Sequence, residues 1–392
     1  MKQVLKKGAV PSKFSWTKEE SMGMKSRRMR AERRRHKSLA SDVCLEPEIE
    51  NVACNLSVCD EVCGHQDDVV SVHHFVPAAR STNNKSTQTV GRLSSFSISN
   101  FVFDARAVHY YTGLENYDKF AFVLATLGPA AYCLRYRLRQ CHNISVEDQF
   151  FLTMIKLRLH TPDFELSRMF DVSEFSVGNI FVTWVNFMSL QWHEIDIWPS
   201  RDLVSYFMPT DFWKTFPSTR IIIDGMECPI KKPAGPVAQQ ASFSTYKNRN
   251  TVKVVVGSTP GGLLSHIPQS FGGSASDRQL IERSNLVDKC DPHDSVMADK
   301  GFNVQDIFTM KDISVNIPTF MTGKNRLPGL SVLRDRKIAS KRVHIERIIG
   351  LAKTYKILQQ PMNVTESALA SEIIFVCCMI CNFRNCIIST TA

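Results

Sequence analysis

Several common signatures are missing from this chain of 392 residues. No apolar segment of signal-peptide length follows residues 1–7, so no secretory leader is predicted. The apolar stretch 373–388 is interrupted by Asn382, Arg384 and Asn385 and is short for a bilayer. We therefore expect a buried helix there, and no membrane partner.

Familiar catalytic motifs are also missing. There is no Gly-x-Ser-x-Gly elbow, no phosphate-binding loop ending in Gly-Lys-Ser/Thr and no zinc-protease helix, which disfavours a hydrolase of small molecules. Cys59, Cys63 and His65 are zinc-ligand types, but no second ligand pair of regular spacing accompanies them, so a zinc site is disfavoured. Cysteines within apolar segments, such as Cys377 and Cys378, are predicted to be reduced and to pack as small hydrophobes.

What the chain does have is a basic N-terminal arm. Residues 1–37 hold thirteen Lys and Arg against three Glu, which accounts for the whole net charge of +10. The densest part includes Arg28, Arg33, Arg34 and Arg35, and it is suited to DNA phosphates or to nuclear import. We therefore predict a DNA-binding arm and a nuclear location; a merely solvated basic tail is the alternative.

The middle of the chain changes from polar to helical. Residues 38–103 lack sustained periodicity and are predicted to be a mostly disordered linker, and 104–200 a helical region. Three helices, beginning near Ser145, Thr161 and Ser173, with a tight turn at Asp171-Val172, predict a helix-turn-helix at about 145–188.

The third of these helices is the candidate for entering a DNA groove. It is expected to present Glu174, Phe175, Ser176 and Asn179 outward. Because helix-turn-helix patterns are loose, an ordinary three-helix structural unit is the alternative.

From about residue 216 to 388 the pattern becomes strand-rich and then helical again. Short β-branched runs predict strands at 221–224, 251–256, 262–267, 295–298 and 315–318, with helices after the third strand and at the end. This order indicates an α/β fold with a mixed sheet flanked by helices.

Three acidic residues stand out in this region. Asp224 and Asp299 each follow an apolar run, and Glu346 lies in a helical segment. If the two strands are neighbours, the acids converge and could hold Mg²⁺ or Mn²⁺ for phosphodiester chemistry. The alternative for Glu346 is a salt bridge to Arg342 or Arg347 on a solvated helix.

Two further acidic residues lie in this region, Asp277 and Glu227. Asp277 opens a helix, and its position favours an N-cap over a metal ligand. Glu227 follows Asp224 by three residues and could support the site or have no part in it. Five basic residues surround Glu346, and we expect the DNA backbone to approach them: Lys341, Arg342, His344, Arg347 and Lys353. Of these, Arg342, Arg347 and Lys353 are predicted to bind DNA.

From about residue 145 to 388 the chain resembles the Harbinger-like DDE transposases. The resemblance is carried by ordered blocks at 223–227, 246–253, 272–277, 298–302, 316–320 and 342–353, the last containing Arg-Val-His-Ile-Glu-Arg-Ile-Ile-Gly. It implies an RNase H-like catalytic domain at 216–388, Asp224, Asp299 and Glu346 as metal-binding catalytic triad, and double-stranded DNA as substrate. By the same resemblance, a separate Myb-like protein can serve as partner; whether the chain forms a homodimer stays open.

A shorter resemblance lies at residues 5–14, which look like the closing segment of a THAP zinc finger; chance similarity is the alternative. The finger's zinc ligands have no counterpart in this chain. Together these features predict a transposase-derived, metal-dependent endonuclease or strand transferase. A DNA-binding protein that has kept the acids without cleaving DNA is the second hypothesis.

Overall fold

The computed structural model describes residues 96–136, 138, 143–319 and 328–389. The chain divides into two units, Met1–Lys85 and Ser86–Ala392, and every described residue belongs to the second. The predicted basic arm with Arg28, Arg33, Arg34 and Arg35, the Cys59–His65 segment and the THAP-like segment 5–14 all lie outside the described residues.

The first described segment is folded, although the sequence predicts a mostly disordered linker up to residue 103. The 3₁₀ helix η1 (Ile98–Phe101) packs with Ile98 only 2% exposed. The Ser97 hydroxyl and the Ile98 N–H both donate to one carboxylate oxygen of Asp148 at 2.9 Å. The linker prediction is therefore wrong at its end, because aromatic and aliphatic side chains from 96 onward join the helical core.

The helix-turn-helix expected at 145–188 has its predicted local structure. It consists of α4 (Val146–Leu159), α5 (Asp163–Met169) and α6 (Glu174–His193). Ser145 and Ser173 cap the first and third helices by accepting backbone N–H bonds. Asp171 makes the turn before α6 in the left-handed region, with φ of 51°. These helices follow α2 (Ala105–Thr112), α3 (Tyr117–Ala125) and η2 (Pro129–Cys133).

The second half is built around one mixed sheet. Its central path runs β2-β3-β1-β6-β7, with β4 and β5 also paired to β3. The five predicted strands are found as β1 (Thr219–Pro229), β3 (Arg249–Ser258), β4 (Leu264–His266), β6 (Ser295–Met297) and β7 (Ser314–Asn316). The two-residue strands β2 (Phe243–Ser244) and β5 (Phe271–Gly272) are too short to give a sequence pattern.

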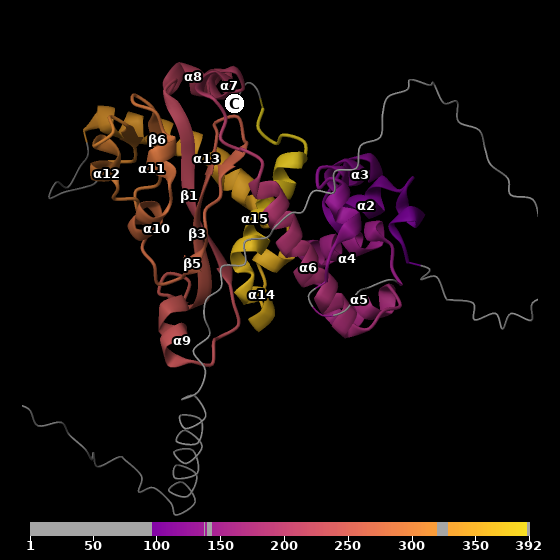
Figure 1. Cartoon of the computed structure of the whole chain (residues 1–392). Helices are drawn as coiled ribbons and strands as arrows, with labels where there is room; N and C mark the ends of the chain where they lie inside the picture. The colour runs from indigo at the N-terminus through magenta and orange to yellow at the C-terminus, as the bar shows by residue number, and fades with distance from the viewer. Residues whose placement is uncertain (1–95, 137, 139–142, 320–327, 390–392) are drawn as a thin grey trace, which may run out of the picture. The chain divides into compact units, whose positions relative to one another are not determined.

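Strand β1 is buried on both faces, as its continuous apolar run requires. Ile221 and Ile223 face a core shared with α10 (Asp277–Arg283), α11 (Leu286–Lys289) and α12 (Gln305–Thr309). Ile222 and Met226 face the opposite core, which includes α13 (Gly329–Ala352) and α15 (Ala370–Phe383). Helices therefore flank the sheet on both sides (Figure 1).

The C-terminal helix α15 connects the sheet to the helix-turn-helix. Its Phe383 ring lies 5.4 Å from Trp192, and Phe375 stacks on His193 at 3.7 Å. Cys377 and Cys378 are fully buried, and burial raises the pKa of each thiol well above the ordinary value of a cysteine. They behave as the predicted small hydrophobes. No helix in the described ranges is long and apolar enough to span a membrane.

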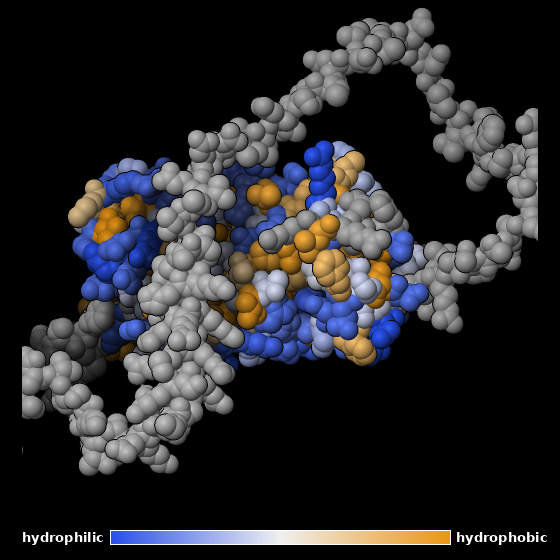
Figure 2. Space-filling model, turned by 60° about the horizontal axis from the view of Figure 1, so that its bottom comes forward, coloured by the Kyte–Doolittle hydropathy of each residue, from blue (hydrophilic) through white to orange (hydrophobic). Residues whose placement is uncertain are grey.

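The remaining helices are short and connect the larger elements: α7 (Arg201–Tyr206), α8 (Thr210–Thr215), α9 (Pro236–Ser242), η3 (Lys356–Leu358) and α14 (Val364–Ala368). On the face drawn in Figure 2, hydrophobic residues gather in patches between large hydrophilic areas. Exposed aromatic side chains include Phe164 and Phe175, both in the helix-turn-helix.

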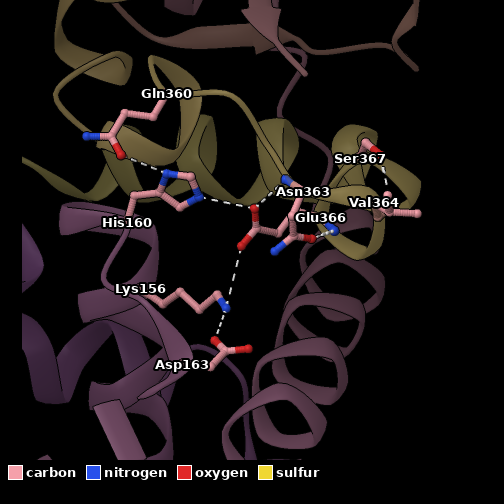
Figure 3. Close-up of polar contacts among 8 residues, drawn as sticks. All are labelled: Lys156, His160, Asp163, Gln360, Asn363, Val364, Glu366 and Ser367. Carbon is pink, nitrogen blue, oxygen red and sulfur yellow. Dashed lines mark hydrogen bonds and ion pairs between the residues drawn. The ribbon is translucent and has the colours of Figure 1, made fainter. Parts of the chain in front are cut away.

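A buried polar network ties the helix-turn-helix to the segment before α15 (Figure 3). Glu366 of α14 lies 3.1 Å from His160 Nε2 and 3.5 Å from Lys156 Nζ, and Lys156 also pairs with Asp163. The other ring nitrogen of His160 lies 3.0 Å from the Gln360 side-chain oxygen. Lys156 and Glu366 are each nearly inaccessible to water. Such a pair is stable only while both partners remain charged and hydrogen-bonded.

Glu366 is the centre of this network. Burial alone would raise its pKa, but the bond to His160, the Asn363 N–H and the charge of Lys156 outweigh burial and lower the pKa below the ordinary 4.5. The folded state is thus stabilised by ionised Glu366. This contribution is complete above the unfolded pKa and is lost as pH falls through the lowered, folded pKa.

We expect Glu366→Gln to lower the free energy of unfolding by about 1–3 kcal/mol at pH 7, because Lys156 loses a buried charged partner. The variant should also lose less stability than the wild type as pH falls through the acid range. Urea denaturation from pH 7 to pH 4 measures both effects, with Glu165→Gln on the exposed side of α5 as the control. Equal stability of all three proteins at pH 7 would contradict a structural role for this network.

Candidate active site

Two of the predicted acids are brought together by the register of neighbouring strands. β1 and β6 are parallel, with Ile222 opposite Met297, and Asp224 and Asp299 each follow two residues later. The two acids therefore lie at the same level along the two strands. The expectation that Asp224 ends its strand is wrong, because β1 continues to Pro229 through its antiparallel pairing with β3.

The third acid arrives from helix α13, which packs against the same face of β1. Between the three acids lies the guanidinium of Arg342. Its Nη1 donates to Asp299 Oδ1 at 2.9 Å, and its Nη2 lies 3.9 Å from Asp224 Oδ2 and 3.7 Å from Glu346 Oε1. Asp224, Asp299 and Glu346 thus converge on one positive charge.

The three carboxylates differ in their access to water. The Asp224 side chain is 24% exposed, whereas Asp299 and Glu346 are about half exposed. Burial raises the pKa of Asp224; the Gly225 N–H and Arg342 lower it in part, while the charges of Asp299 and Glu346 raise it again. The site therefore has one desolvated acid at its base and two open acids at its rim.

The donor chemistry fits a hard divalent cation. All three side chains offer carboxylate oxygens, the ligands that Mg²⁺ and Mn²⁺ prefer. Around Arg342, however, these oxygens are spread over a guanidinium, and no cluster of three or more His, Cys, Asp or Glu in the described ranges has the spacing of a metal site. The chemical type of the three side chains therefore suits the cation, whereas their present arrangement is built around the arginine.

Asp277 and Glu227 lie on the other side of β1. Residues at odd positions of β1 face away from α13, and the missing side chain of Gly225 leaves room for the Asp277 carboxylate. Asp277 Oδ1 forms an ion pair with Lys253 Nζ at 2.9 Å, although the angle does not suit a hydrogen bond. Glu227 accepts a hydrogen bond from the Thr251 hydroxyl. Neither acid belongs to the cluster around Arg342.

The predicted capping role of Asp277 is also wrong. The N-cap of α10 is Ser276, whose hydroxyl accepts the Gln279 N–H while the Gln279 side chain bonds back to Ser276. Asp277 is the first residue inside the helix. Its carboxylate is drawn instead to Lys253 on β3, a partner distant in sequence.

Not all basic residues near Glu346 are available to a ligand. Lys341 is buried and paired with Asp211, and His344 is buried with its Nδ1 3.0 Å from the Pro260 carbonyl. Burial lowers the pKa of His344. The expectation that these two residues approach DNA is therefore wrong, because they lie on the core-facing side of α13.

The other basic residues of this helix are differently placed. Arg347 is exposed and Lys353, at the helix end, is partly exposed, so both can reach a ligand. Arg342 is turned toward the acids and is only 11% exposed. The sequence contained the signal for this pairing, since Arg342 and Glu346 are four residues apart on one helix face.

At the start of α6 the structure separates the residues expected to face DNA. Glu174 and Phe175 are exposed and Ser176 is partly exposed, its hydroxyl close to that of Ser173. Asn179 is only 6% exposed. Its predicted outward orientation is wrong, because one further turn brings this helix face against the core of the three-helix unit.

Because burial and like charges raise the pKa of Asp224, the ionised form destabilises the folded protein, and stability falls as pH rises through the folded pKa. We expect Asp224→Asn to raise the unfolding temperature at pH 7 in EDTA, and this gain to disappear at acid pH. A change of about 1 kcal/mol moves the midpoint by about 2–4 °C, which calorimetry resolves. The exposed Asp288→Asn variant serves as control. A lower midpoint for Asp224→Asn than for the wild type would contradict the analysis.

Two family models match parts of the described region. Residues 223–382 match the model of the DDE superfamily endonucleases, and residues 142–191 match the model of the helix-turn-helix of DDE superfamily endonucleases. No curated protein and no solved structure matches the chain. The first matched range contains Asp224, Asp299 and Glu346, and the second contains α4, α5 and most of α6. The chain therefore carries a DDE superfamily endonuclease domain preceded by that superfamily's helix-turn-helix.

Proposed function

We propose that this protein is a transposase-derived, metal-dependent endonuclease or strand transferase that acts on phosphodiester bonds of double-stranded DNA. The observation that carries the proposal is the convergence of Asp224, Asp299 and Glu346 on one cation position, within the residues that match the endonuclease family. Three carboxylates, from strand β1, from the segment after strand β6 and from helix α13, are held together although their charges repel one another. A catalytic requirement explains this arrangement better than a structural one.

Asp224, Asp299 and Glu346 are the residues that would hold Mg²⁺ or Mn²⁺. When bound at such a site, divalent cations lower the pKa of an attacking water or hydroxyl and stabilise the leaving oxygen of a phosphodiester. Asp224, at the base, fixes the depth at which a ligand is held because its strand is buried on both sides. Asp299 and Glu346 at the rim leave the site open to a DNA backbone.

The surroundings of the acids support a nucleic-acid substrate. Arg347 and Lys353 offer positive charge beside Glu346, which favours approach of phosphate groups. The exposed start of α6, with Glu174, Phe175 and Ser176, supports docking of the helix-turn-helix in a DNA groove. The basic arm with Arg28, Arg33, Arg34 and Arg35 would add sequence-independent affinity.

The finer assignments belong to the same proposal. The strand order β4-β3-β1-β6-β7, antiparallel on one side of β1 and parallel on the other, supports an RNase H-like fold. The sequence blocks support the Harbinger group, and the arm supports a nuclear location. A truncated THAP finger, a Myb-like partner protein and a homodimer are further proposals that rest on the sequence resemblance alone or, for the homodimer, on no specific residue.

The second candidate function is DNA binding without cleavage. It is favoured by one observation: Arg342 already supplies a positive charge to all three acids, so the triad is held together without a metal ion. A protein that kept only the binding role could retain this arrangement for stability. The two functions differ in whether the three acids are required for DNA cleavage.

We expect the purified chain to nick labelled duplex DNA in Mg²⁺ or Mn²⁺ and not in EDTA, and Asp299→Asn to reduce the rate at least about 100-fold, since even groups that only orient metal ligands are worth 10–100-fold. Gel separation of the labelled strands measures the rate. Asp288→Asn on α11 removes an exposed acid of the same domain and should cleave normally.

Binding of the same duplex, measured by fluorescence anisotropy, separates the two candidate functions. Binding without cleavage in every metal would favour the DNA-binding protein. Cleavage that is equal in the wild type and Asp299→Asn would contradict the assignment of the active site.

A further inference from the structure

We propose that Arg342 is the resident counter-ion of the acid cluster: it positions the three carboxylates in the resting protein and competes with the divalent cation for the place between them. This inference rests on the proposed metal-dependent function and concerns the regulation of the same site. Its basis is the position of one side chain, whose guanidinium contacts Asp224, Asp299 and Glu346 together.

The ion pairs of Arg342 are made with these three acids. In the described part of the chain, its ion pairs go to these three carboxylates, at 2.9, 3.7 and 3.9 Å. Its side chain is only 11% exposed, and its buried Nε has no hydrogen-bond partner among the described residues. A buried donor without a partner is unfavourable, so the arginine is held here by the acids and not by a wider polar network.

Charge makes this arrangement incomplete. One guanidinium carries a single positive charge against three carboxylates, and its planar fork reaches only one of them at hydrogen-bond distance. A divalent cation carries twice that charge and draws oxygen ligands to about 2 Å. The acids therefore gain more from the cation than from Arg342, and the two positive charges repel each other if both remain.

The position of Arg342 on α13 would also allow its side chain to move away from the three acids. It lies one helical turn before Glu346 on the same face of α13, so rotation of its side chain alone changes the distance. Asp299, which holds it most closely, is half exposed, so the route passes toward solvent.

Two opposite consequences follow for the resting protein. Arg342 keeps the acids close enough to receive a metal ion, and this stabilises the metal-free fold. It also weakens the first binding of the metal ion, because the guanidinium has to be displaced. A residue with a purely structural role would have the first effect and not the second.

The test is a titration of the full chain with Mn²⁺, in which electron paramagnetic resonance measures free Mn²⁺, alongside unfolding midpoints in EDTA. We expect Arg342→Gln to bind Mn²⁺ about tenfold more tightly than the wild type and to unfold at a lower temperature in EDTA. Arg342→Lys, which keeps the charge, should restore weaker Mn²⁺ binding. Arg336→Gln removes an exposed charge from the same helix and should behave like the wild type.

The outcomes separate this inference from the proposed function. If Mn²⁺ binds the wild type and this binding is lost in Asp299→Asn, the proposed metal site is supported. If Arg342→Gln then binds Mn²⁺ no more tightly than Arg336→Gln does, the proposed role of Arg342 is overturned. If no Mn²⁺ binding depends on Asp299, the proposed function fails and this inference fails with it. Should Arg342→Gln not fold, Arg342→Ala titrated beside Arg342→Lys decides, and equal affinity of all folded variants overturns the proposal.

Discussion

Repulsion between three carboxylates, whose backbone positions are fixed by strand pairing and helix packing, is the constraint on which the candidate site depends. The parallel pairing of β1 with β6 places Asp224 and Asp299 at one level, and the packing of α13 adds Glu346. Moving the backbone positions of Asp224 and Asp299 apart would require breaking the pairing between β1 and β6. The protein accommodates the three charges with one guanidinium. Burial of Asp224, and after it the charges of Asp299 and Glu346, leave the pKa of Asp224 raised. Such an arrangement is costly for stability and useful for binding a more strongly charged cation.

The same helices that support the acids also connect them to the helix-turn-helix. α15 packs under the sheet and contacts α6 through Phe375 and Phe383. The network around Glu366 adds a charged connection from α14 to α4 and α5. The helical unit and the half of the protein that contains the three acids therefore share one hydrophobic core. This is the physical basis for proposing that the two parts act on one DNA molecule.

Much of the site could be predicted because it depends on local pattern. Buried runs before Asp224 and Asp299 predicted two strands, although not that the strands are neighbours. Ser145 and Ser173 predicted helix starts that the capping bonds confirm. The errors in this half of the chain and in α6 have a common cause, which is that side-chain direction and strand length depend on partners that are distant in sequence. Asp277 turns to Lys253 across the sheet, Asn179 turns into a core, and β1 continues past Asp224 because β3 pairs with it. For the same reason, the pattern suggested a pair between Arg342 and Glu346 but could not show that Arg342 serves two further acids.

The central claim is that the position now held by the Arg342 guanidinium is a divalent-cation site. Anomalous diffraction from crystals of the full chain grown with Mn²⁺ tests it most directly. The account predicts an anomalous peak about 2 Å from carboxylate oxygens of Asp224 and Asp299, with the Arg342 side chain displaced toward solvent. Density for Arg342 unchanged between the three acids, with Mn²⁺ bound elsewhere or not at all, would contradict it.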